Sequence, residues 1–428
     1  MDGCRYEIGA GALVLRVLTL STLFPDTSRP NFGIFVERQT RELAIRPEVE
    51  LTVVAPLGLP PAPFSALRRY APLAKLPQQE EWRGLQLYRP RFPIIPVIGG
   101  RFHPGSIARS VLPLVRSLHE VRPFDVIDAS FFYPDGPAAM MLARALSIPF
   151  SIKARGADIH HWARKRSTAP MIRAAADAAS GLLAVSQALR NDMIAIGMDG
   201  AKIKVHYTGV DLDRFFPTPD RIAAKAGLGL SADVVISVGA LIPRKGQGLL
   251  IRALPLLPSV TLLLAGEGPA RKGYEQLAHQ LNVAGRVRFL GSVPHEKLPQ
   301  LLAAADVMAL PSSSEGLANA WVEALACGTP LVISDAGGAK ELVDRPAAGR
   351  IVAREPKAIA DAIGELLRDP PDPSAARASA LRFTWQANGD TLLAHLLEII
   401  GSIRPCNDSS PSSLRRQGPA SLRQGFEK

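Results

Sequence analysis

Residues 310–335 read LPSSSEGLANAWVEALACGTPLVISD and carry the pattern that decides the fold. An apolar run at 305–310 leads into a polar loop, and a helical pattern then extends from Gly316 to Gly328, a residue suited to a helix C-terminus. A second apolar run follows at 330–333. The order of strand, loop, helix and strand is the βαβ unit of a parallel sheet. The stretch therefore predicts an α/β fold.

Two carboxylates lie inside this unit, Glu315 in the loop and Glu323 in the helix. Eight helical positions rise about 12 Å and rotate a side chain by about 80°. We therefore expect both acids to line one side of a site, about one substituted diphosphate apart. We expect the free backbone N–H groups of Gly316, Leu317 and Ala318 to form a helix N-terminus between them, which favours an anion. Gly316 would also allow a ligand to approach the backbone closely.

Composition and charge set the outer bounds of the function. The chain has 428 residues, long enough for two domains, and its 47% hydrophobic and 21% charged residues are typical of a globular protein. The formal net charge of +11 suits nucleic acid, an anionic membrane or a phosphorylated ligand. Because no nucleic-acid-binding signature accompanies this charge, we expect no nucleic-acid partner.

Cysteine usage and hydropathy indicate the compartment. Cys4, Cys327 and Cys406 are far apart and lack metal-binding spacing, which is typical of a reducing compartment. No run of about 18 apolar residues would span a membrane. The apolar segment 12–24 contains Arg16 and lacks a cleavage site, so it reads as a first strand rather than a signal peptide. We expect a cytoplasmic protein, with peripheral contact at the inner face of the plasma membrane as an open alternative.

Strand patterns recur in two successive series along the chain. The first series of expected strands lies at residues 14–20, 50–56, 82–89, 124–129, 150–154, 181–186 and 204–206. The second series lies at residues 234–238, 260–265, 287–290, 306–310 and 330–333. Expected helices include those at residues 34–43, 358–367 and 384–400. Strands alternating with helices predict two parallel sheets.

Several motifs, in order along residues 14–400, resemble those of a known enzyme family. EGLANAWVE at 315–323 resembles the paired-glutamate signature of retaining GT-B glycosyltransferases of family 4. FPDTSRPNFGIFVE at 24–37 resembles the opening of a bacterial subgroup of that family. YTGVDLDRFFP at 207–217 resembles the passage between its two domains, with Thr208 in place of the usual Asn.

The resemblance implies a GT-B fold, with two Rossmann-like domains whose parallel sheets face an inter-domain cleft. We expect an acceptor-binding domain at 1–215 and a donor-binding domain at 216–383. A helix at 384–402 should pack back on the first domain. The tail at 403–428 lacks apolar periodicity and is predicted to be disordered.

The resemblance also assigns roles in donor binding. By that resemblance Glu315 contacts the donor sugar and Glu323 takes the ribose hydroxyls, while residues 316–318 receive the diphosphate. Val293 falls where relatives receive the nucleotide base through backbone groups.

Two basic residues usually clamp the donor diphosphate in this family. Lys245 matches one of them, whereas the other position holds Ala240, so Arg244 is the natural substitute. The leaving group is a nucleoside diphosphate whose growing charge two cations and a helix dipole neutralise. We therefore expect no metal ion and no cofactor.

The first domain departs from the family at its expected reaction centre. Arg155 replaces the His of a His-Gly-x-Asp motif, and Ser130 stands where relatives often carry another His. As a fixed positive charge, Arg155 could stabilise the departing phosphate, so we assign it to catalysis with Glu315 and Lys245.

Two further residues are expected at the acceptor side of the cleft. Asp158 is either a cleft residue or a helix N-cap. Gly33 either lets a substrate approach the backbone or is a turn glycine. The stretch 60–104, rich in Pro, Arg and aromatic residues, is either a contact to a membrane or acceptor, or a solvated insertion.

The expected reaction is a retaining, hexosyltransferase-type transfer from a nucleoside-diphosphate sugar to an acceptor hydroxyl. The resemblance implies a glycan or lipid-linked glycan acceptor, in bacterial exopolysaccharide or cell-envelope glycan synthesis. A front-face transfer would use the departing phosphate as base. Two other classes stay open: a nucleotide-sugar epimerase or hydrolase on the same fold, and a non-catalytic binder, for which Ala240 and Arg155 are the motivation.

Overall fold

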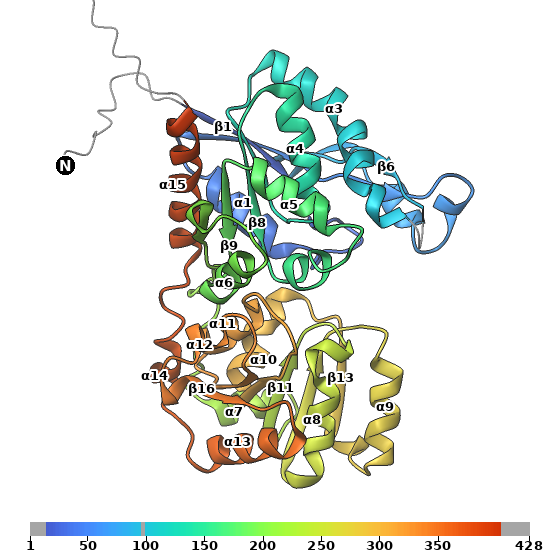
Figure 1. Cartoon of the computed structure of the whole chain (residues 1–428). Coiled ribbons are helices and arrows are strands. Elements are labelled where there is room, and N and C mark those ends of the chain that lie inside the picture. The colour runs from blue at the N-terminus through green and yellow to red at the C-terminus, as the bar shows by residue number, and fades with distance from the viewer. Residues whose placement is uncertain (1–13, 96–98, 404–428) are drawn as a thin grey trace, which may run out of the picture.

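The computed structural model describes residues 14–95 and 99–403 of the chain. The tail residues 404–428, for which we predict disorder, lie outside the described residues, as do Cys4 and Cys406. Two large sheets, one in each half of the chain, form the framework (Figure 1). None of the helices in the described ranges combines the length and apolar character needed to cross a membrane.

The first sheet has eight strands in the order β10-β9-β8-β7-β1-β2-β5-β4. Its strands are β1 (Leu15–Leu20), β2 (Val49–Val54), β4 (Gln79–Trp82), β5 (Leu85–Tyr88), β7 (Val126–Ala129), β8 (Phe150–Ala154), β9 (Gly181–Ala184) and β10 (Ile203–Val205). All neighbours are parallel except β4 and β5. β7, β8 and β9 are buried along their whole length, which is expected for central parallel strands covered on both faces.

Helices cover both faces of the first sheet. On one face lie α3 (His103–Val121), α4 (Asp135–Leu146) and α5 (Ala169–Ala178). On the other lie α1 (Ile34–Ala44) and α15 (Trp385–Ile403). Since successive strand residues point to opposite faces, Leu18 packs in the core under α4 and Val17 in the core under α15.

The second sheet has six parallel strands in the order β13-β12-β11-β14-β15-β16. They are β11 (Asp233–Val238), β12 (Val260–Ala265), β13 (Val287–Gly291), β14 (Val307–Leu310), β15 (Leu331–Ser334) and β16 (Gly349–Val352). The main helices around it are α8 (Gln247–Ala253), α9 (Arg271–Gln280), α10 (Leu298–Ala304), α11 (Asn319–Ala326), α12 (Ala339–Leu342) and α13 (Pro356–Arg368). The βαβ unit predicted around Glu315 is β14–α11–β15.

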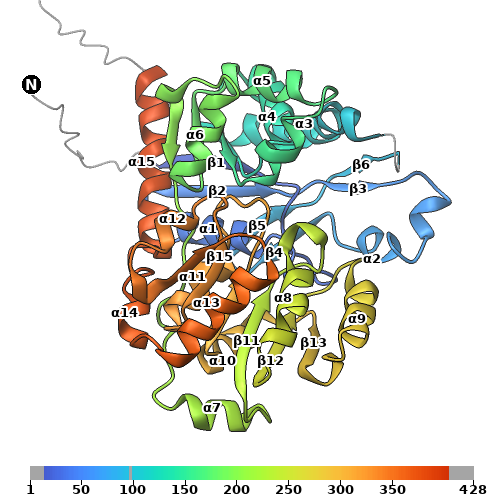
Figure 2. The same ribbon diagram turned by 60° about the horizontal axis from the view of Figure 1, so that its bottom comes forward.

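The chain returns to the first sheet at its end. After α14 (Pro373–Arg377), α15 runs along α1, as both ribbon views show (Figures 1 and 2). Arg46 pairs with Asp390 of α15 at 2.6 Å, and Ser151 Oγ lies 2.8 Å from His395 Nε2. These contacts hold α15 against the first half of the chain.

A small two-stranded sheet, β3 (Leu57–Leu59) with β6 (Arg91–Pro93), extends away from the first sheet together with α2 (Ala71–Ala74) (Figure 2). The remaining α-helices of residues 14–95 and 99–403 are α6 (Gln187–Ala195) and α7 (Arg221–Gly227).

Most predicted elements are found, and two expectations are wrong in detail. The strands predicted at 150–154 and 260–265 have the same bounds in the structure. The strand predicted at 82–89 is instead a hairpin of β4 and β5, because Arg83 and Gly84 both adopt positive φ and reverse the chain.

The second error concerns the helix predicted from Gly316, which begins at Asn319. Its N-cap residue Ala318 is extended, with φ −73° and ψ 121°. The Gly316 carbonyl accepts hydrogen bonds from the Gly338 N–H (2.8 Å) and the Ser186 hydroxyl (3.1 Å). Because these contacts from other segments take that carbonyl, it does not start a helix.

Candidate active site

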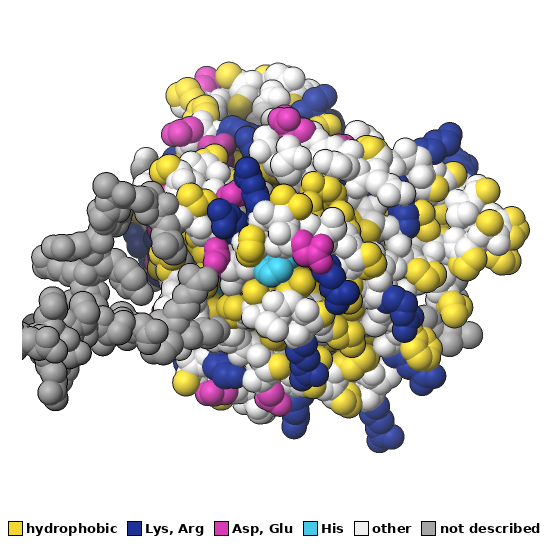
Figure 3. Space-filling model, turned by 90° about the horizontal axis from the view of Figure 1, so that it is seen from above, with side chains coloured by type: hydrophobic (Ala, Val, Ile, Leu, Met, Phe, Trp, Pro, Cys, Tyr) yellow, Lys and Arg dark blue, Asp and Glu magenta, His cyan; other side chains and the backbone are white. Residues whose placement is uncertain are grey.

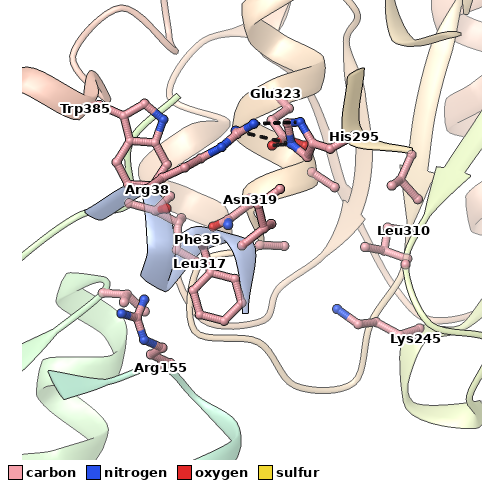
Figure 4. A pocket seen from close by; sticks show the side chains of 17 residues that line it. Phe35, Arg38, Arg155, Lys245, His295, Leu310, Leu317, Asn319, Glu323 and Trp385 are labelled. Atoms are coloured by element: carbon pink, nitrogen blue, oxygen red, sulfur yellow. Dashed lines mark hydrogen bonds and ion pairs between the residues drawn. The ribbon is translucent and has the colours of Figure 1, made fainter. Parts of the chain in front are cut away.

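A cavity of about 300 Å³ lies between the two halves of the chain (Figure 4). This volume is at the lower end of those of ligand sites. The N-terminal half contributes Ile34, Phe35, Arg38, Arg155, Val185 and Thr208 to its lining, and Trp385 at the start of α15 is also present. The C-terminal half contributes Val238, Gly239, Lys245, His295, Leu310, Leu317, Ala318, Asn319, Ala320 and Glu323.

The carboxyl ends of parallel strands bring these side chains together. Arg155 directly follows β8, and Gly239 directly follows β11. The loop that leads from β14 to α11 carries Leu317 and Ala318. In open parallel sheets ligands bind at this edge, so the position of the cavity follows from the topology.

Glu315 forms an ion pair with the cation that the sequence singles out. Its Oε1 lies 2.6 Å from Lys245 Nζ, and its Oε2 lies 3.7 Å from Arg244 Nη1. Glu315 is 8% exposed, and a carboxylate so buried requires such partners. Arg244, which also donates to the Ser314 carbonyl, therefore contacts the same acid as Lys245 but does not line the cavity.

Glu323 lies in α11 and faces a histidine. Glu323 Oε1 is 2.8 Å from His295 Nε2, and Arg38 of α1 approaches the same imidazole from the N-terminal half (Figure 4). Burial lowers the pKa of Arg38, and the nearby Glu323 carboxylate opposes that shift. The two acids predicted to mark the site are thus each held by a basic side chain.

The start of α11 lies at the cavity, but three residues later than predicted. Leu317 and Ala318 line the cavity together with Asn319 and Ala320, whose N–H groups belong to the first turn of the helix. Gly316 does not line it. Of the predicted donor-binding residues 316–318, Leu317 and Ala318 thus line the cavity, while the first N–H groups of the helix belong to Asn319 and Ala320.

Gly316 instead makes the close approach between the two halves. A Cβ on Gly316 would lie 2.4 Å from the Arg155 carbonyl oxygen, and a Cβ on Gly156 would lie 2.6 Å from the Gly316 nitrogen. The close contact between the two backbones explains why a glycine is needed at position 316. The prediction that Gly316 contacts a ligand is therefore corrected.

Arg155 lies at the cavity in a fixed orientation. Its Nε donates to the Ser130 carbonyl at 2.7 Å and its Nη2 to Gln39 Oε1 at 3.2 Å, and its guanidinium lies 4.7 Å from the centre of the Phe35 ring. Burial lowers the pKa of Arg155 to about 10, opposed by nearby carboxylates that include Asp128. The side chain therefore presents a positive charge at neutral pH.

Asp158, which we predicted in the cleft or as an N-cap, is fully buried and does not line the cavity. It accepts hydrogen bonds from the N–H groups of Gly156 (2.8 Å), Arg155 (3.0 Å) and Phe132 (3.1 Å). Burial raises its pKa against these hydrogen bonds. Asp158 thus fixes the turn that carries Arg155, and the prediction of a substrate contact is corrected.

Gly33 and Val293 are likewise engaged by the chain itself. Gly33 has φ 70°, and a Cβ there would lie 2.5 Å from the Leu23 carbonyl carbon and oxygen, so the turn interpretation holds. The Val293 carbonyl accepts a hydrogen bond from Asn31 Nδ2 at 3.1 Å across the two halves. Neither residue lines the cavity.

Sequence reasoning missed most of the residues that line the cavity, and five of these carry side chains that matter to the argument below. They are Phe35, Arg38, His295, Asn319 and Trp385. Phe35 and Arg38 are three positions apart on α1 and so share a helix face, which was the available signal. Trp385 has a buried indole N–H without a hydrogen-bond partner, and nothing in its local sequence indicated a cavity.

Metal-binding side chains do not gather in the described part of the chain. Within residues 14–95 and 99–403, no group of three or more His, Cys, Asp or Glu side chains is placed to hold a metal ion. That the reaction uses no metal ion stays a prediction.

Two family models match consecutive parts of the chain. Residues 34–214 match the model described as Glycosyltransferase Family 4, and residues 220–382 match the model described as Glycosyl transferases group 1. Together they cover both sheets except β1, and all cavity-lining residues except Trp385.

Sequence relatives belong to the same class. A proposed teichuronic acid biosynthesis glycosyltransferase of Bacillus subtilis strain 168, TuaC, is 29% identical over 359 residues, which cover 82% of this chain and 88% of that protein. The D-inositol 3-phosphate glycosyltransferase of Mycobacterium tuberculosis strain H37Ra is 40% identical over 220 residues. That match spans 48% of this chain and 45% of the relative, so it concerns less than half of that enzyme.

Solved structures share the fold over nearly the whole chain. Sucrose-phosphate synthase from Thermosynechococcus elongatus has a TM-score of 0.74 at 20% identity, covering 91% of this chain and 100% of that chain. Anabaena HepE in complex with UDP and glucose has a TM-score of 0.69 at 24% identity, covering 90% of this chain and 99% of that chain. The GT-B fold expected from the sequence is confirmed.

Proposed function

Because the chain belongs to the glycosyltransferases, with a family 4 part followed by a group 1 part, we propose that it moves a sugar from a nucleoside-diphosphate sugar to an acceptor hydroxyl with retention of configuration. The observation that carries this proposal is the arrangement of Lys245, Glu315 and Glu323 around one cavity. Lys245 and Glu323 line it, and Glu315 lies 2.6 Å from the Lys245 ammonium.

Donor binding would exchange one ion pair for another. The diphosphate takes the Lys245 ammonium, which frees Glu315 to accept hydrogen bonds from the sugar hydroxyls. Glu323 accepts hydrogen bonds from the ribose at the opposite end, and the N–H groups of Asn319 and Ala320 face the phosphates. Arg244 contributes by its contact with Glu315 rather than by direct contact with the donor.

The transfer step needs stabilisation of the leaving diphosphate. The bond from the sugar C1 to the phosphate oxygen breaks while the acceptor oxygen bonds to C1 on the same face. The acceptor proton passes to the departing phosphate oxygen, which serves as the base. Lys245 and Arg155 supply the fixed positive charge that makes the diphosphate a better leaving group. We propose that the reaction uses no metal ion or cofactor.

The relatives suggest which donor and acceptor to test first. HepE was solved with UDP and glucose, and TuaC is described as acting in teichuronic acid biosynthesis. We therefore propose UDP as the first nucleotide to test, and a glycan or lipid-linked glycan of the cell envelope or exopolysaccharide as the acceptor.

A protruding part of the N-terminal half fits contact with an anionic membrane surface, where a lipid-linked acceptor would lie. Its exposed apolar side chains are Phe64, Leu67, Ile95 and Phe102, and exposed Arg68, Arg69 and Arg101 lie beside them. The right-hand edge of Figure 3 shows apolar and basic side chains together on this part of the molecule. Apolar insertion and basic attraction both favour anionic lipid.

The test is a donor-binding and turnover assay. UDP, GDP and ADP are titrated against the wild type in a thermal-shift assay, where a ligand at about 100 times its Kd adds about 2.7 kcal/mol of stability. Glu323→Ala and Lys245→Ala should abolish the shift, and Lys357→Ala, an exposed lysine of α13, should retain it. Transfer from the matching nucleotide sugar should give a product of retained configuration by NMR. Absence of binding to all three nucleotides, or an inverted product, would refute the proposal.

A further inference from the structure

His295 lies at the junction of the two halves and is almost fully buried. Its Nε2 is 2.8 Å from Glu323 Oε1. Its Nδ1 is 2.9 Å from Arg38 Nη2 and 3.1 Å from Arg214 Nη2, and its carbonyl also accepts from Arg214 at 3.0 Å. Figure 4 shows Arg38 reaching from α1 toward the His295 and Glu323 side chains. One imidazole thus connects Glu323 to an arginine of the opposite half.

These contacts decide which imidazole nitrogen carries the hydrogen. A guanidinium group has donors and no acceptor, so the Nδ1 that faces Arg38 and Arg214 must accept. Nε2 then carries the hydrogen and donates to Glu323 Oε1. The remaining contact, from Arg38 Nη1 to Nε2, is the longest at 3.4 Å and does not change this assignment.

The assignment leaves the second carboxylate oxygen for a ligand. Among the described residues, no hydrogen bond reaches Glu323 Oε2, and Glu323 lines the cavity. The donation to Oε1 prevents free rotation of the carboxylate, so Oε2 keeps one direction. A carboxylate held in this way can discriminate among hydroxyl positions because its acceptor is already oriented.

The connection depends on contact between the two halves. Arg38 belongs to α1, whereas His295 and Glu323 belong to the second Rossmann-like half. The Asn31 side chain makes a second contact at the same junction, to the Val293 carbonyl at 3.1 Å. A separation of the halves would take Arg38 away from His295 Nδ1, because Arg38 belongs to the N-terminal half.

We propose that His295 and Arg38 are positioning residues that orient Glu323 toward the ribose of the donor, and that Arg38 makes this orientation depend on closure of the cleft. The inference rests on the proposed donor site, in which Glu323 binds the ribose. It adds a specificity role to two residues outside the paired-glutamate motif and links the N-terminal half to recognition of the nucleotide.

The experiment measures discrimination between ribose and deoxyribose. Dissociation constants are determined for UDP, GDP and ADP and for their 2′-deoxy and 3′-deoxy forms, with wild type, His295→Ala, Arg38→Ala and Glu323→Ala. Matched controls are Arg41→Ala, on the outer face of α1, and His279→Ala, an exposed histidine of α9. Circular dichroism and melting curves establish that each variant is folded.

We expect the wild type to prefer the ribonucleotide over at least one deoxy form. His295→Ala and Arg38→Ala should each weaken ribonucleotide binding about tenfold, the scale of one hydrogen bond to a charged group, and leave deoxynucleotide binding unchanged. The double variant His295→Ala with Arg38→Ala should lose no more ribonucleotide affinity than His295→Ala alone, because both residues act through one contact with Glu323. His295→Gln, whose amide can donate to Glu323 and accept from Arg38, should restore most of the preference, and the controls should match the wild type.

Two results would overturn the proposal and are distinguishable. If His295→Ala and Arg38→Ala weaken the binding of ribonucleotide and deoxynucleotide equally, the two residues have a structural role and do not orient Glu323. If the wild type shows no preference, or Glu323→Ala binds the ribonucleotide normally, the donor-site assignment itself fails. Should His295→Ala not fold, His295→Gln and Arg38→Ala still decide between these results.

Discussion

Lys245 Nζ lies 2.6 Å from Glu315 Oε1, although the two residues are 70 positions apart in the chain. Lys245 comes from the loop after β11 and Glu315 from the loop after β14, and these two strands are neighbours in the second sheet. Buried charges of opposite sign stabilise each other until a ligand replaces one of them. The ion pair therefore defines where the donor diphosphate is expected to bind.

Replacement of Lys245 should impair the chemical step. Under the proposed function, Lys245→Ala removes a charge that stabilises the leaving diphosphate, and we expect kcat/KM for transfer to fall about 10²–10³-fold. Steady-state kinetics with the accepted nucleotide sugar is the measurement. Lys357→Ala serves as the control, since its ion pair with Asp361 is exposed. A loss below threefold would contradict the role of Lys245.

Glu315→Gln should separate diphosphate binding from sugar transfer. The substitution frees Lys245 from its carboxylate partner, so binding of the nucleoside diphosphate alone should be unchanged or tighter. Transfer should fall, because the sugar hydroxyls lose their charged acceptor. Calorimetric titration with the nucleoside diphosphate, paired with turnover of its sugar, measures both. Weaker diphosphate binding together with normal transfer would contradict this prediction.

Gly316→Ala should separate the two halves without unfolding either. The added Cβ would lie 2.4 Å from the Arg155 carbonyl oxygen and 2.7 Å from a Val185 methyl group, both across the junction. We expect lost transfer activity and an increased radius of gyration by small-angle scattering, with retained circular dichroism. Gly273→Ala in α9, where nothing lies within 4 Å, is the control and should be neutral or slightly stabilising. Wild-type activity of Gly316→Ala would show that close contact at this point is dispensable.

The buried histidine of α15 should make stability depend on pH. Burial lowers the pKa of His395 from 6.5 to about 4, so between these values the unfolded chain binds a proton that the folded chain does not. The folded-state pKa is depressed, and the unfolding free energy therefore falls as pH decreases from about 6.5 to about 4, by about 3 kcal/mol in total.

The measurement is chemical denaturation of wild type and His395→Gln across that range. The difference in unfolding free energy between the two proteins should shrink as pH falls. Asp135, whose pKa burial raises to about 7, contributes in the opposite direction, but it is present in both proteins and cancels in the difference. A difference that stays constant with pH would contradict the prediction.

Removal of exposed apolar side chains should weaken membrane association. A variant with Phe64→Asp, Leu67→Asp and Phe102→Asp loses apolar insertion and adds negative charge, so co-sedimentation with anionic vesicles should fall at least tenfold. Leu256→Asp, at an exposed leucine of the C-terminal half, should have no effect. Equal sedimentation of the triple variant and wild type would place any membrane contact elsewhere.

Local patterns in the sequence were sufficient to predict the α/β class and the βαβ unit around Glu315. Apolar runs with turn residues at their ends predicted strands such as 150–154, because burial on both faces selects for continuous apolar sequence. The loop position of Glu315, between the strand and the helix, followed from the same local pattern. These features depend on residues close together in the chain.

The other features of the site, the start of the helix and the partners of the two acids, depend on tertiary contacts that no local pattern encodes. The helix starts at Asn319 rather than Gly316 because Gly338 and Ser186 take the Gly316 carbonyl. Arg38 and His295, 257 positions apart, meet across the two halves. The sequence by itself determined which strands and helices form and which acids follow them. The tertiary structure alone decided which partners those acids have, because that depends on packing between segments far apart in the chain.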